Sequence, residues 1–381
     1  MSRKILLVTG SRGEYGYIRP ILKEIEKSDS LSYDIVATNM LLVPEFGYAI
    51  NQLLEDQFDV KYQIDMSMSG YTNASMSKSL GIFIQSLTDI VKNDLPDIIL
   101  LAGDRGEMLA GAIVGAHMNI PTAHIQAGEL SGNIDGMTRH AITKFVHLHF
   151  AANVDAELRL KKMGEQEFRV FNTGAPQLDE FHNYNYLSNK DFYNKFQLNK
   201  NEDFALIVLH PITEESEKSE SQMLLMLDVI SELGIQAVLI YPNNDAGSVG
   251  IQNAVESIRV TNIHVKRNVD RESYANLMNK AKFMIGNSSS GILEAPTFKL
   301  PAVNIGRRQN GRLQADNVIN VEFKKLAIKD AINKIYNDKV FLAKLKKVEN
   351  PYGDGDSSKK IVNILQNISI DNKLLMKDLT Y

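Results

Sequence analysis

The feature that most constrains this chain is a repeated alternation between short apolar runs and segments with helical spacing. Residues 5–8 (Ile-Leu-Leu-Val) form the first run, and apolar residues within 18–25 follow at helical spacing. A continuously apolar run is typical of a parallel strand covered on both faces. Further strand-like runs stand at 34–37, 98–101, 121–125, 170–173, 205–209, 237–240, 283–285 and 301–305. The chain therefore predicts an α/β fold built from β-α-β units.

The alternation occurs in two successive arrays. The first ends near residue 173, and the pattern restarts near 204 after a stretch rich in Asn, Asp and Tyr. We predict two Rossmann-like domains that face each other across a cleft, residues 1–178 and 179–356. In the remaining residues, 357–381, a helix over about 357–368 is expected to pack back on the first domain. The residues after that helix are expected to form a loose tail.

Composition excludes several classes of function. The net charge is −4, so no broad basic surface is expected for nucleic acid or for anionic membranes. The chain has no cysteine, which excludes disulfides, thiolate metal sites and cysteine nucleophiles. No apolar run approaches the roughly 20 residues that span a bilayer, and the N-terminus enters a strand at once. We expect a cytoplasmic protein without nucleic-acid or membrane partners.

The first strand is followed by a glycine-rich turn, Gly10-Ser11-Arg12-Gly13-Glu14-Tyr15-Gly16. A dinucleotide fingerprint needs G-x-G-x-x-G, and Arg12 occupies the position of its second glycine. An arginine at this turn indicates direct pairing with a phosphate group. The alternative is an ordinary β-α turn that carries one solvated arginine.

Two carboxylates end consecutive strands of the first array. Asp104 follows the run 98–101, and Glu129 follows the run 121–125. If those strands are neighbours, their ends lie roughly 5 Å apart, which suits an acid-base pair acting on opposite faces of a substrate ring. The alternative for Asp104 is a capping role for the helix that begins at about residue 106.

The second array carries a serine-rich turn, residues 286–291, that leads into a short helix at 292–298. Amides at a helix start and serine hydroxyls favour an anion site, although a plain serine cap remains an alternative. Glu294 could accept the two hydroxyls of a ribose. His210 follows a strand, so a role in the cleft and a structural role are both open. His124, His140, His147 and His149 lack partners for a zinc site, so no metal is expected.

Ligands of open parallel sheets bind beyond the carboxyl ends of the strands. The polar clusters of both domains stand at such ends. We therefore expect one shared site, to which the first domain contributes Arg12, Asp104, Arg105, Glu129 and Asp135. The second domain contributes His210, Asn243, Ser288, Ser289, Glu294 and Arg308.

Seven stretches together resemble a known family. They are "TGSRGEYG", "LAGDRGE", "HIQAGELSGNIDGMTRHAITK", "HPIT", "YPNNDAGS", "GNSSSGILEAP" and "NIGRRQNGR", in this order between Thr9 and Arg312. They resemble the hydrolysing UDP-N-acetylglucosamine 2-epimerases, and general similarity extends to about Gln366. The resemblance implies the two-domain glycosyltransferase-B fold, no cofactor, and a homo-oligomer, either a dimer or a dimer of dimers.

The resemblance also implies roles for individual residues. Asp104 and Glu129 match the catalytic carboxylates, and Asp135 is a third catalytic candidate. Asp135, Arg139 and His140 match the loop and helix that help shape the sugar site, and Arg105 is a further substrate-binding candidate. The UDP-binding positions of the family match Arg12, His210, Asn243, Ser288, Ser289, Glu294 and Arg308.

The implied reaction converts UDP-N-acetylglucosamine and water to UDP and N-acetylmannosamine, for sialic acid and capsule polysaccharide biosynthesis. It proceeds by elimination to 2-acetamidoglucal and then hydration. Two rivals stay open: the same reaction on UDP-2,4-diacetamido-2,4,6-trideoxy-glucose for legionaminic acid, and a glycosyltransferase of the same fold. The segment Ile125-Gln126-Ala127 departs from the sequence more common in the family at this place, so the identity of the sugar stays open. The position of Glu129 favours hydrolysis over the non-hydrolysing epimerases.

Overall fold

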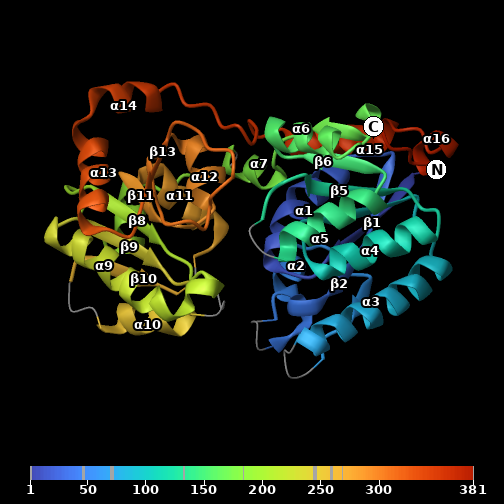
Figure 1. Cartoon of the computed structure of the whole chain (residues 1–381), viewed down its shortest axis with the longest axis horizontal. Helices are drawn as coiled ribbons and strands as arrows, with labels where there is room; N and C mark the ends of the chain where they lie inside the picture. The colour runs from blue at the N-terminus through green and yellow to red at the C-terminus, as the bar shows by residue number, and fades with distance from the viewer. Residues whose placement is uncertain are drawn as a thin grey trace. The chain divides into compact units, whose positions relative to one another are not determined.

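The computed structural model describes residues 2–44, 48–68, 73–131, 134–182, 184–242, 247–257, 261–267 and 269–380, without the side chains of residues 73, 213 and 214. The chain forms two compact units (Figure 1). Unit 1 comprises residues 1–180 and 352–381, and unit 2 comprises residues 181–351. The chain therefore changes unit at 180/181 and 351/352, where the sequence predicts 178/179 and 356/357.

Unit 1 contains a parallel sheet of seven strands in the order β3-β2-β1-β4-β5-β6-β7. The strands are β1 (Arg3–Thr9), β2 (Leu31–Thr38), β3 (Tyr62–Ile64), β4 (Ile98–Ala102), β5 (Thr122–Ala127), β6 (Leu148–Ala151) and β7 (Val170–Asn172). The order reverses at β1, as in doubly wound folds, and the carboxyl ends of β4 and β5 are direct neighbours.

Helices cover both faces of this sheet because successive strand residues point to opposite sides. Ile5 and Leu7 of β1 pack in one core with α1 (Arg12–Ile25), α2 (Ile50–Glu55) and α15 (Ser357–Asn367). Leu6 and Val8 pack in the other core with α3 (Asn73–Asn93), α4 (Gly106–His117) and α5 (Ile134–Phe145) (Figure 1). Unit 1 also contains α6 (Val154–Lys162), the first two residues of α7 (Asp179–His182) and α16 (Asn372–Leu375).

The C-terminal segment corrects one expectation. It contains a helical turn, α16, rather than a loose tail, and Leu374 is 1% exposed within the core of unit 1. The prediction of a loose tail was wrong. Arg169 donates hydrogen bonds to backbone carbonyls of this segment, and the polar composition of the segment does not reveal such contacts.

Unit 2 contains a parallel sheet of six strands in the order β10-β9-β8-β11-β12-β13. The strands are β8 (Phe204–Val208), β9 (Gln236–Ile240), β10 (Ile263–Lys266), β11 (Phe283–Gly286), β12 (Ala302–Ile305) and β13 (Val318–Val321). The helices are α8 (Asn189–Phe196), α9 (Ser219–Glu232), α10 (Ser248–Ser257), α11 (Arg271–Lys280), α12 (Ser290–Leu293), α13 (Lys325–Asn337) and α14 (Lys339–Leu345). Two parallel α/β sheets confirm the predicted fold class.

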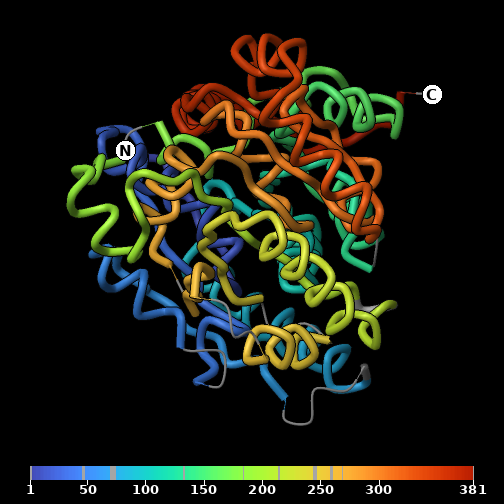
Figure 2. Tube along the Cα trace, turned by 90° about the vertical axis from the view of Figure 1, so that its left-hand side faces the viewer, coloured from blue at the N-terminus to red at the C-terminus, as the bar shows by residue number. Residues whose placement is uncertain are grey.

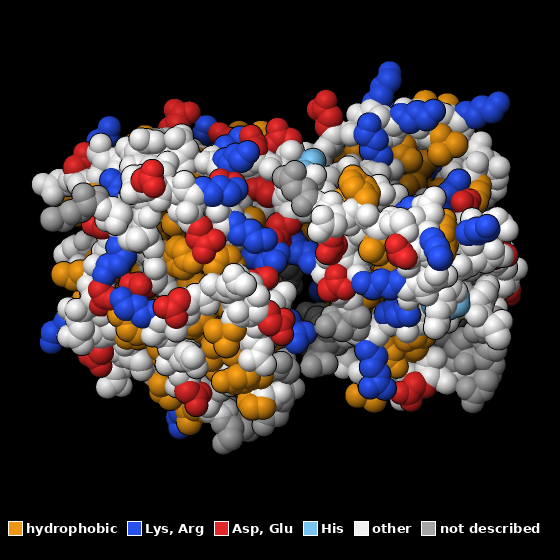
Figure 3. All heavy atoms as spheres, turned by 180° about the vertical axis from the view of Figure 1, so that it is seen from behind, with side chains coloured by type: hydrophobic (Ala, Val, Ile, Leu, Met, Phe, Trp, Pro, Cys, Tyr) orange, Lys and Arg blue, Asp and Glu red, His pale blue; other side chains and the backbone are white. Residues whose placement is uncertain are grey.

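The surface agrees with the charge balance of the sequence. Lys and Arg side chains lie among Asp and Glu side chains on the face seen in Figure 3. Within the described ranges, no helix combines the length and apolar character that crossing a membrane requires.

Candidate active site

The turn after β1 is built from reciprocal hydrogen bonds. The hydroxyl of Ser11 caps α1 by accepting from the amide of Glu14 at 3.3 Å, and Glu14 Oε2 accepts from the amide of Gly10 at 2.6 Å. This arrangement is close to a capping box. A Cβ at Gly10 would lie 2.3 Å from Glu107 Oε1, so a larger residue there would displace the buried Glu107 carboxylate. The turn thus presents Arg12, the first residue of α1, with an exposed side chain.

Glu14 and Glu107 are both buried beneath this turn. Burial raises the pKa of Glu14 well above its ordinary value, and the nearby Glu107 carboxylate raises it further. The charge of Arg105 and the hydrogen bond from the Gly10 amide oppose this rise.

Asp104 follows β4 and is held by Arg139 of α5. Its Oδ2 accepts from Arg139 Nη2 and from Ser131 Oγ, the latter at 2.8 Å. Burial opposes ionisation of Asp104, but the Arg139 guanidinium outweighs it and holds the pKa of this carboxyl below its ordinary value. Asp104 does not cap α4, since the N-cap residue is Arg105 and that cap has no side-chain hydrogen bond.

Arg139 links Asp104 to the end of β5. Its Nη1 donates to the carbonyl of Gln126 at 2.5 Å, and its side chain is almost fully buried. Gln126 has a φ of 62°, in the left-handed region, at a register shift between β5 and β6. Such strain persists only where the surroundings enforce it and is concentrated at functional sites. Gln126 departs from the commoner family run but was not among the predicted site residues.

Glu129 follows β5 and is 8% exposed. Its Oε1 accepts from Asn153 Nδ2, while Asn153 Oδ1 caps α6 by accepting from the amide of Ala156 at 2.9 Å. Asn153 was missed in the sequence, although its place directly before a helical segment marked it as a cap. The structure thus brings Asp104 and Glu129 to the ends of neighbouring strands, each held by a different side chain.

The remaining unit 1 candidates lie on the same loops. Asp135 lies in the first turn of α5, and its charge acts on Arg105, which follows Asp104 directly. His140 follows Arg139 on α5, and its buried Nδ1 has no hydrogen-bond partner among the described residues. Burial, and then the charges of Arg139 and Arg159, lower the pKa of His140. His140 is therefore mainly neutral at pH 7.

In unit 2, Asn287 joins the loops that follow three strands. Its Oδ1 accepts from the amide of His210 at 2.7 Å, and its Nδ2 donates to the His210 carbonyl at 2.8 Å. The Asn287 carbonyl accepts from Gln309 Nε2 at 2.9 Å and from Arg308 Nη1 at 3.3 Å. Asn287 and Gln309 were not among the predicted site residues. Asn287 was visible in the serine-rich motif, but its contacts connect residues about 20 to 77 positions apart.

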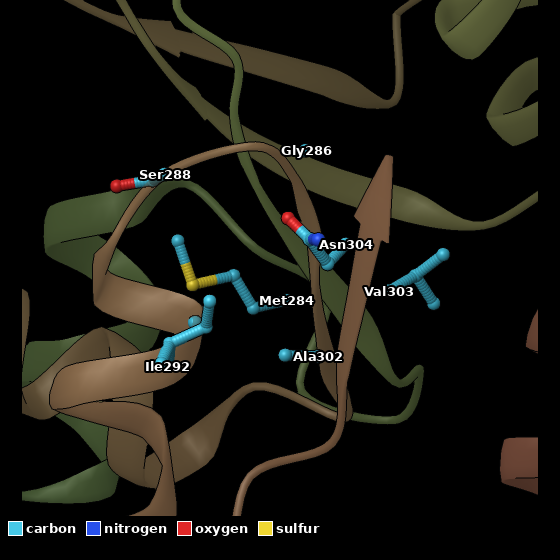
Figure 4. A pocket seen from close by; sticks show the side chains of 8 residues that line it. Met284, Gly286, Ser288, Ile292, Ala302, Val303 and Asn304 are labelled. Atoms are coloured by element: carbon cyan, nitrogen blue, oxygen red, sulfur yellow. The ribbon is translucent and has the colours of Figure 1, made fainter. Parts of the chain in front are cut away.

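The serine-rich turn depends on Gly286, whose φ is 139° and whose Cβ would lie 2.0 Å from the carbonyl oxygen of Val208. Ser288 lies on this turn, and Met284 and Ile292 line a small pocket beneath it (Figure 4). Ser289 precedes α12, which has only four residues and gives way to a 3₁₀ turn, Ala295–Phe298. The predicted single helix over 292–298 is therefore divided, and Pro296 lies in its second part.

Glu294 lies between these two short helices. Burial raises its pKa, while the charge of Arg271 and a hydrogen bond with Ser290 oppose that rise. Its Oε2 is buried and has no hydrogen-bond partner within the part of the chain that the structure describes. A buried carboxylate oxygen without a partner is costly unless a ligand supplies a donor.

The predicted residues are therefore grouped by unit. Unit 1 holds Arg12, Asp104, Arg105, Glu129, Asp135, Arg139 and His140, and unit 2 holds His210, Ser288, Ser289, Glu294 and Arg308. Asn243 lies outside the described residues. In the described part of the chain, no group of three or more His, Asp or Glu side chains is arranged to hold a metal ion.

Comparison with known proteins gives consistent results. Residues 23–366 match a family model described as UDP-N-acetylglucosamine 2-epimerase. A UDP-N,N'-diacetylbacillosamine 2-epimerase (hydrolyzing) of Legionella pneumophila is 34% identical, over 99% of both chains. A UDP-N-acetylglucosamine 2-epimerase of Neisseria meningitidis serogroup B is 30% identical, over 87% of this chain and 86% of the relative. The crystal structure of a UDP-GlcNAc 2-epimerase from Neisseria meningitidis bound to UDP-GlcNAc has a TM-score of 0.82 at 21% identity, covering 95% of this chain and 99% of that one.

Proposed function

This chain belongs to the UDP-N-acetylglucosamine 2-epimerase family, and from that premise we propose that it hydrolyses a UDP-2-acetamido sugar with inversion at C2. It is an enzyme that acts on a UDP-amino sugar. One observation carries the proposal: two carboxylates, Asp104 and Glu129, follow adjacent parallel strands and are held by separate partners. Such a pair suits acid-base chemistry at one carbon.

We assign the base to Asp104, because Arg139 stabilises its ionised form. Asp104 removes the proton from C2 while the C1–O bond breaks and the electron pair leaves with UDP. The product of this step is a 2-acetamidoglucal. Glu129 then delivers a proton to the opposite face of C2, and water adds its oxygen to C1 and releases a proton. The products are UDP and the free manno sugar.

UDP is a good leaving group where positive charge and amides hold its phosphates. Arg12 of unit 1 and Arg308 of unit 2 are the arginines that we assign to this task, with Ser288 and Ser289. The exposed side chains of both arginines are compatible with binding a ligand. The buried, unpartnered Oε2 of Glu294 supports its assignment to the ribose hydroxyls, and His210 lies on the loop that Asn287 holds.

Glu294→Ala is expected to weaken UDP binding by about 1.5–3 kcal/mol, because a charge-assisted hydrogen bond to ribose is lost. The substrate KM should rise by a matching factor. Titration calorimetry with UDP measures this loss. Glu322→Ala, which removes an exposed carboxylate of the same unit, serves as the control and should leave UDP affinity unchanged. An unaltered affinity of the Glu294 variant would remove this residue from the nucleotide site.

Two sugars are candidates. The motif resemblance favoured UDP-N-acetylglucosamine and a role in sialic acid biosynthesis. The relative at 34% identity is named for UDP-N,N'-diacetylbacillosamine, and the relative at 30% identity is named for UDP-N-acetylglucosamine. The first compound is the 2,4-diacetamido-2,4,6-trideoxy sugar of the alternative reading. We therefore treat the diacetamido sugar and UDP-N-acetylglucosamine as equal candidates for the substrate.

The test is to incubate the enzyme with each UDP-sugar, without any acceptor, and to compare kcat/KM. The proposal expects release of UDP together with a free manno sugar from at least one of the two. If UDP appears only after an acceptor is added, the protein is a glycosyltransferase and the proposal fails. The expected homo-oligomer is a separate prediction, which the solution mass by light scattering checks.

A further inference from the structure

Residues 371–380, which we call the C-terminal clasp, are fastened to unit 1 by a buried arginine. Arg169 is 0% exposed and donates to three carbonyls at the end of α16. Its Nη1 donates to Leu374 at 2.5 Å, and its Nη2 donates to Lys373 at 2.8 Å and to Met376 at 2.7 Å. The amide of Thr380 donates to the carbonyl of Gly164 at 3.2 Å, so the chain end lies beside that loop (Figure 2).

The clasp places one ammonium group at the end of α5. Lys377 Nζ donates to the carbonyls of Thr143 and Val146, at 2.8 Å each. It also pairs with Glu165 Oε2 at 2.7 Å. These three contacts match the three N–H groups of an ammonium. A cation at the carboxyl end of a helix satisfies carbonyls that have no partner within the helix and interacts favourably with its dipole.

The counter-ion of Lys377 is itself fixed. The Glu165 side chain is 0% exposed, and its Oε2 also lies 2.9 Å from His149 Nε2 of β6. Lys144, on α5 itself, contacts the other oxygen of Glu165 at 2.9 Å. Arg169 is a further charged group near Lys377, and it donates to Gln166 Oε1 and to the His147 carbonyl as well as to the clasp carbonyls. The ammonium of Lys377 thus forms an ion pair with a buried carboxylate and donates hydrogen bonds to the carboxyl end of α5.

The helix held in this way carries Arg139. The Arg139 side chain donates to Asp104 and to the carbonyl of Gln126. A shift of α5 would therefore change both hydrogen bonds. A displacement of about 1 Å of a positioning group can cost about a hundredfold in rate. We propose that Lys377 is a positioning residue for the reaction: it fixes α5 so that Arg139 keeps its contacts with Asp104 and with the Gln126 carbonyl. This inference rests on the proposed role of Asp104.

The test compares Lys377→Met with Lys144→Met. The first variant removes the ammonium from the helix end, whereas the second removes an ammonium from the same carboxylate and leaves the helix-end contacts in place. We expect Lys377→Met to lower kcat about tenfold, with KM within about twofold of the wild-type value. We expect Lys144→Met to keep kcat within about twofold. Titration with UDP gives the folded fraction of each variant, so that kcat refers to folded enzyme.

Two further measurements separate positioning from a general structural role. The acidic limb of the kcat–pH profile should move to higher pH in Lys377→Met, because Asp104 loses part of the stabilisation by Arg139. In an Arg139→Lys background, removal of Lys377 should cost little more, since both changes disturb one contact. If Lys377→Met does not fold, Lys377→Gln takes its place with the same expectations.

The proposal is overturned if the folded Lys377 variant keeps kcat within about twofold of wild type, or if it loses rate without a shift of the acidic limb. Hydrogen exchange of the amides of residues 139–145 needs no substrate and should become faster in this variant only. An inactive wild-type enzyme would refute the proposed function, whereas unchanged exchange would refute the role of Lys377 alone.

Discussion

Asp104→Asn is expected to lower kcat by about a hundredfold or more, the usual scale for a positioned acid or base. The amide keeps the size of the carboxylate and can still accept from Arg139, but it cannot take the proton from C2. Glu129→Gln should have an effect of the same size, because the amide has no proton to deliver to C2. Steady-state kinetics with the preferred UDP-sugar measures both losses.

UDP binding should survive in both variants, since neither carboxylate is assigned to the nucleotide. Asp155→Asn is the matched control: it removes a half-buried carboxylate that pairs with Arg159 on the same unit, and its kcat should not change. Near-normal turnover by either test variant would reduce that residue to a structural role. A loss of UDP affinity would instead indicate that the site had been disturbed as a whole.

Unit 1 is expected to lose several kcal/mol of stability between about pH 6.5 and pH 4. Burial lowers the pKa of His147 and of His149 to about 4 and that of His124 to about 3. Because the unfolded chain binds protons at these residues from about pH 6.5 downward, while the folded unit does not, acidification favours unfolding. Glu165, whose pKa falls to about 2 through His149 and Lys377 against its burial, acts in the same direction.

Glu14 and Asp179 act in the opposite direction, because burial raises the pKa of each and so stabilises the folded unit on acidification, but they are two groups against three histidines. Urea unfolding at pH 7 and at pH 4.5, followed by hydrogen exchange of the β4–β6 amides, measures the effect. His149→Gln keeps a donor for Glu165 and should reduce the dependence on pH by about a third. A dependence that is unchanged in this variant would contradict the assignment of neutral buried histidines.

The central strands could be predicted from the sequence because each one is marked by its own run of apolar residues. Residues 5–8, 98–101 and 205–209 are buried on both faces, so every position is apolar. The edge strands β10 and β13 were not predicted, since they include polar residues and are partly exposed. A two-sided apolar pattern cannot identify a strand that is covered only in part.

The positions of candidate site residues could be predicted where they follow strand ends, as for Asp104 and Glu129. They could not be predicted where they depend on contacts between distant segments. Arg139 and Asp104 are 35 residues apart, and Asn287 and His210 are 77 apart. No local pattern marks such pairs before the fold is known. The left-handed Gln126 and the docking of the clasp by Arg169 were hidden for the same reason.

The most direct test of elimination followed by hydration is one reaction run in D₂O and one run in ¹⁸O-labelled water. Mass spectrometry and proton NMR of the products locate both labels. The account predicts deuterium at C2 of a manno sugar, labelled oxygen at C1 of that sugar, and unlabelled UDP. Simple glycoside hydrolysis would give the oxygen label with the gluco configuration and no deuterium, and epimerisation without hydrolysis would give deuterium without free UDP. The absence of either label from the free sugar would contradict the account.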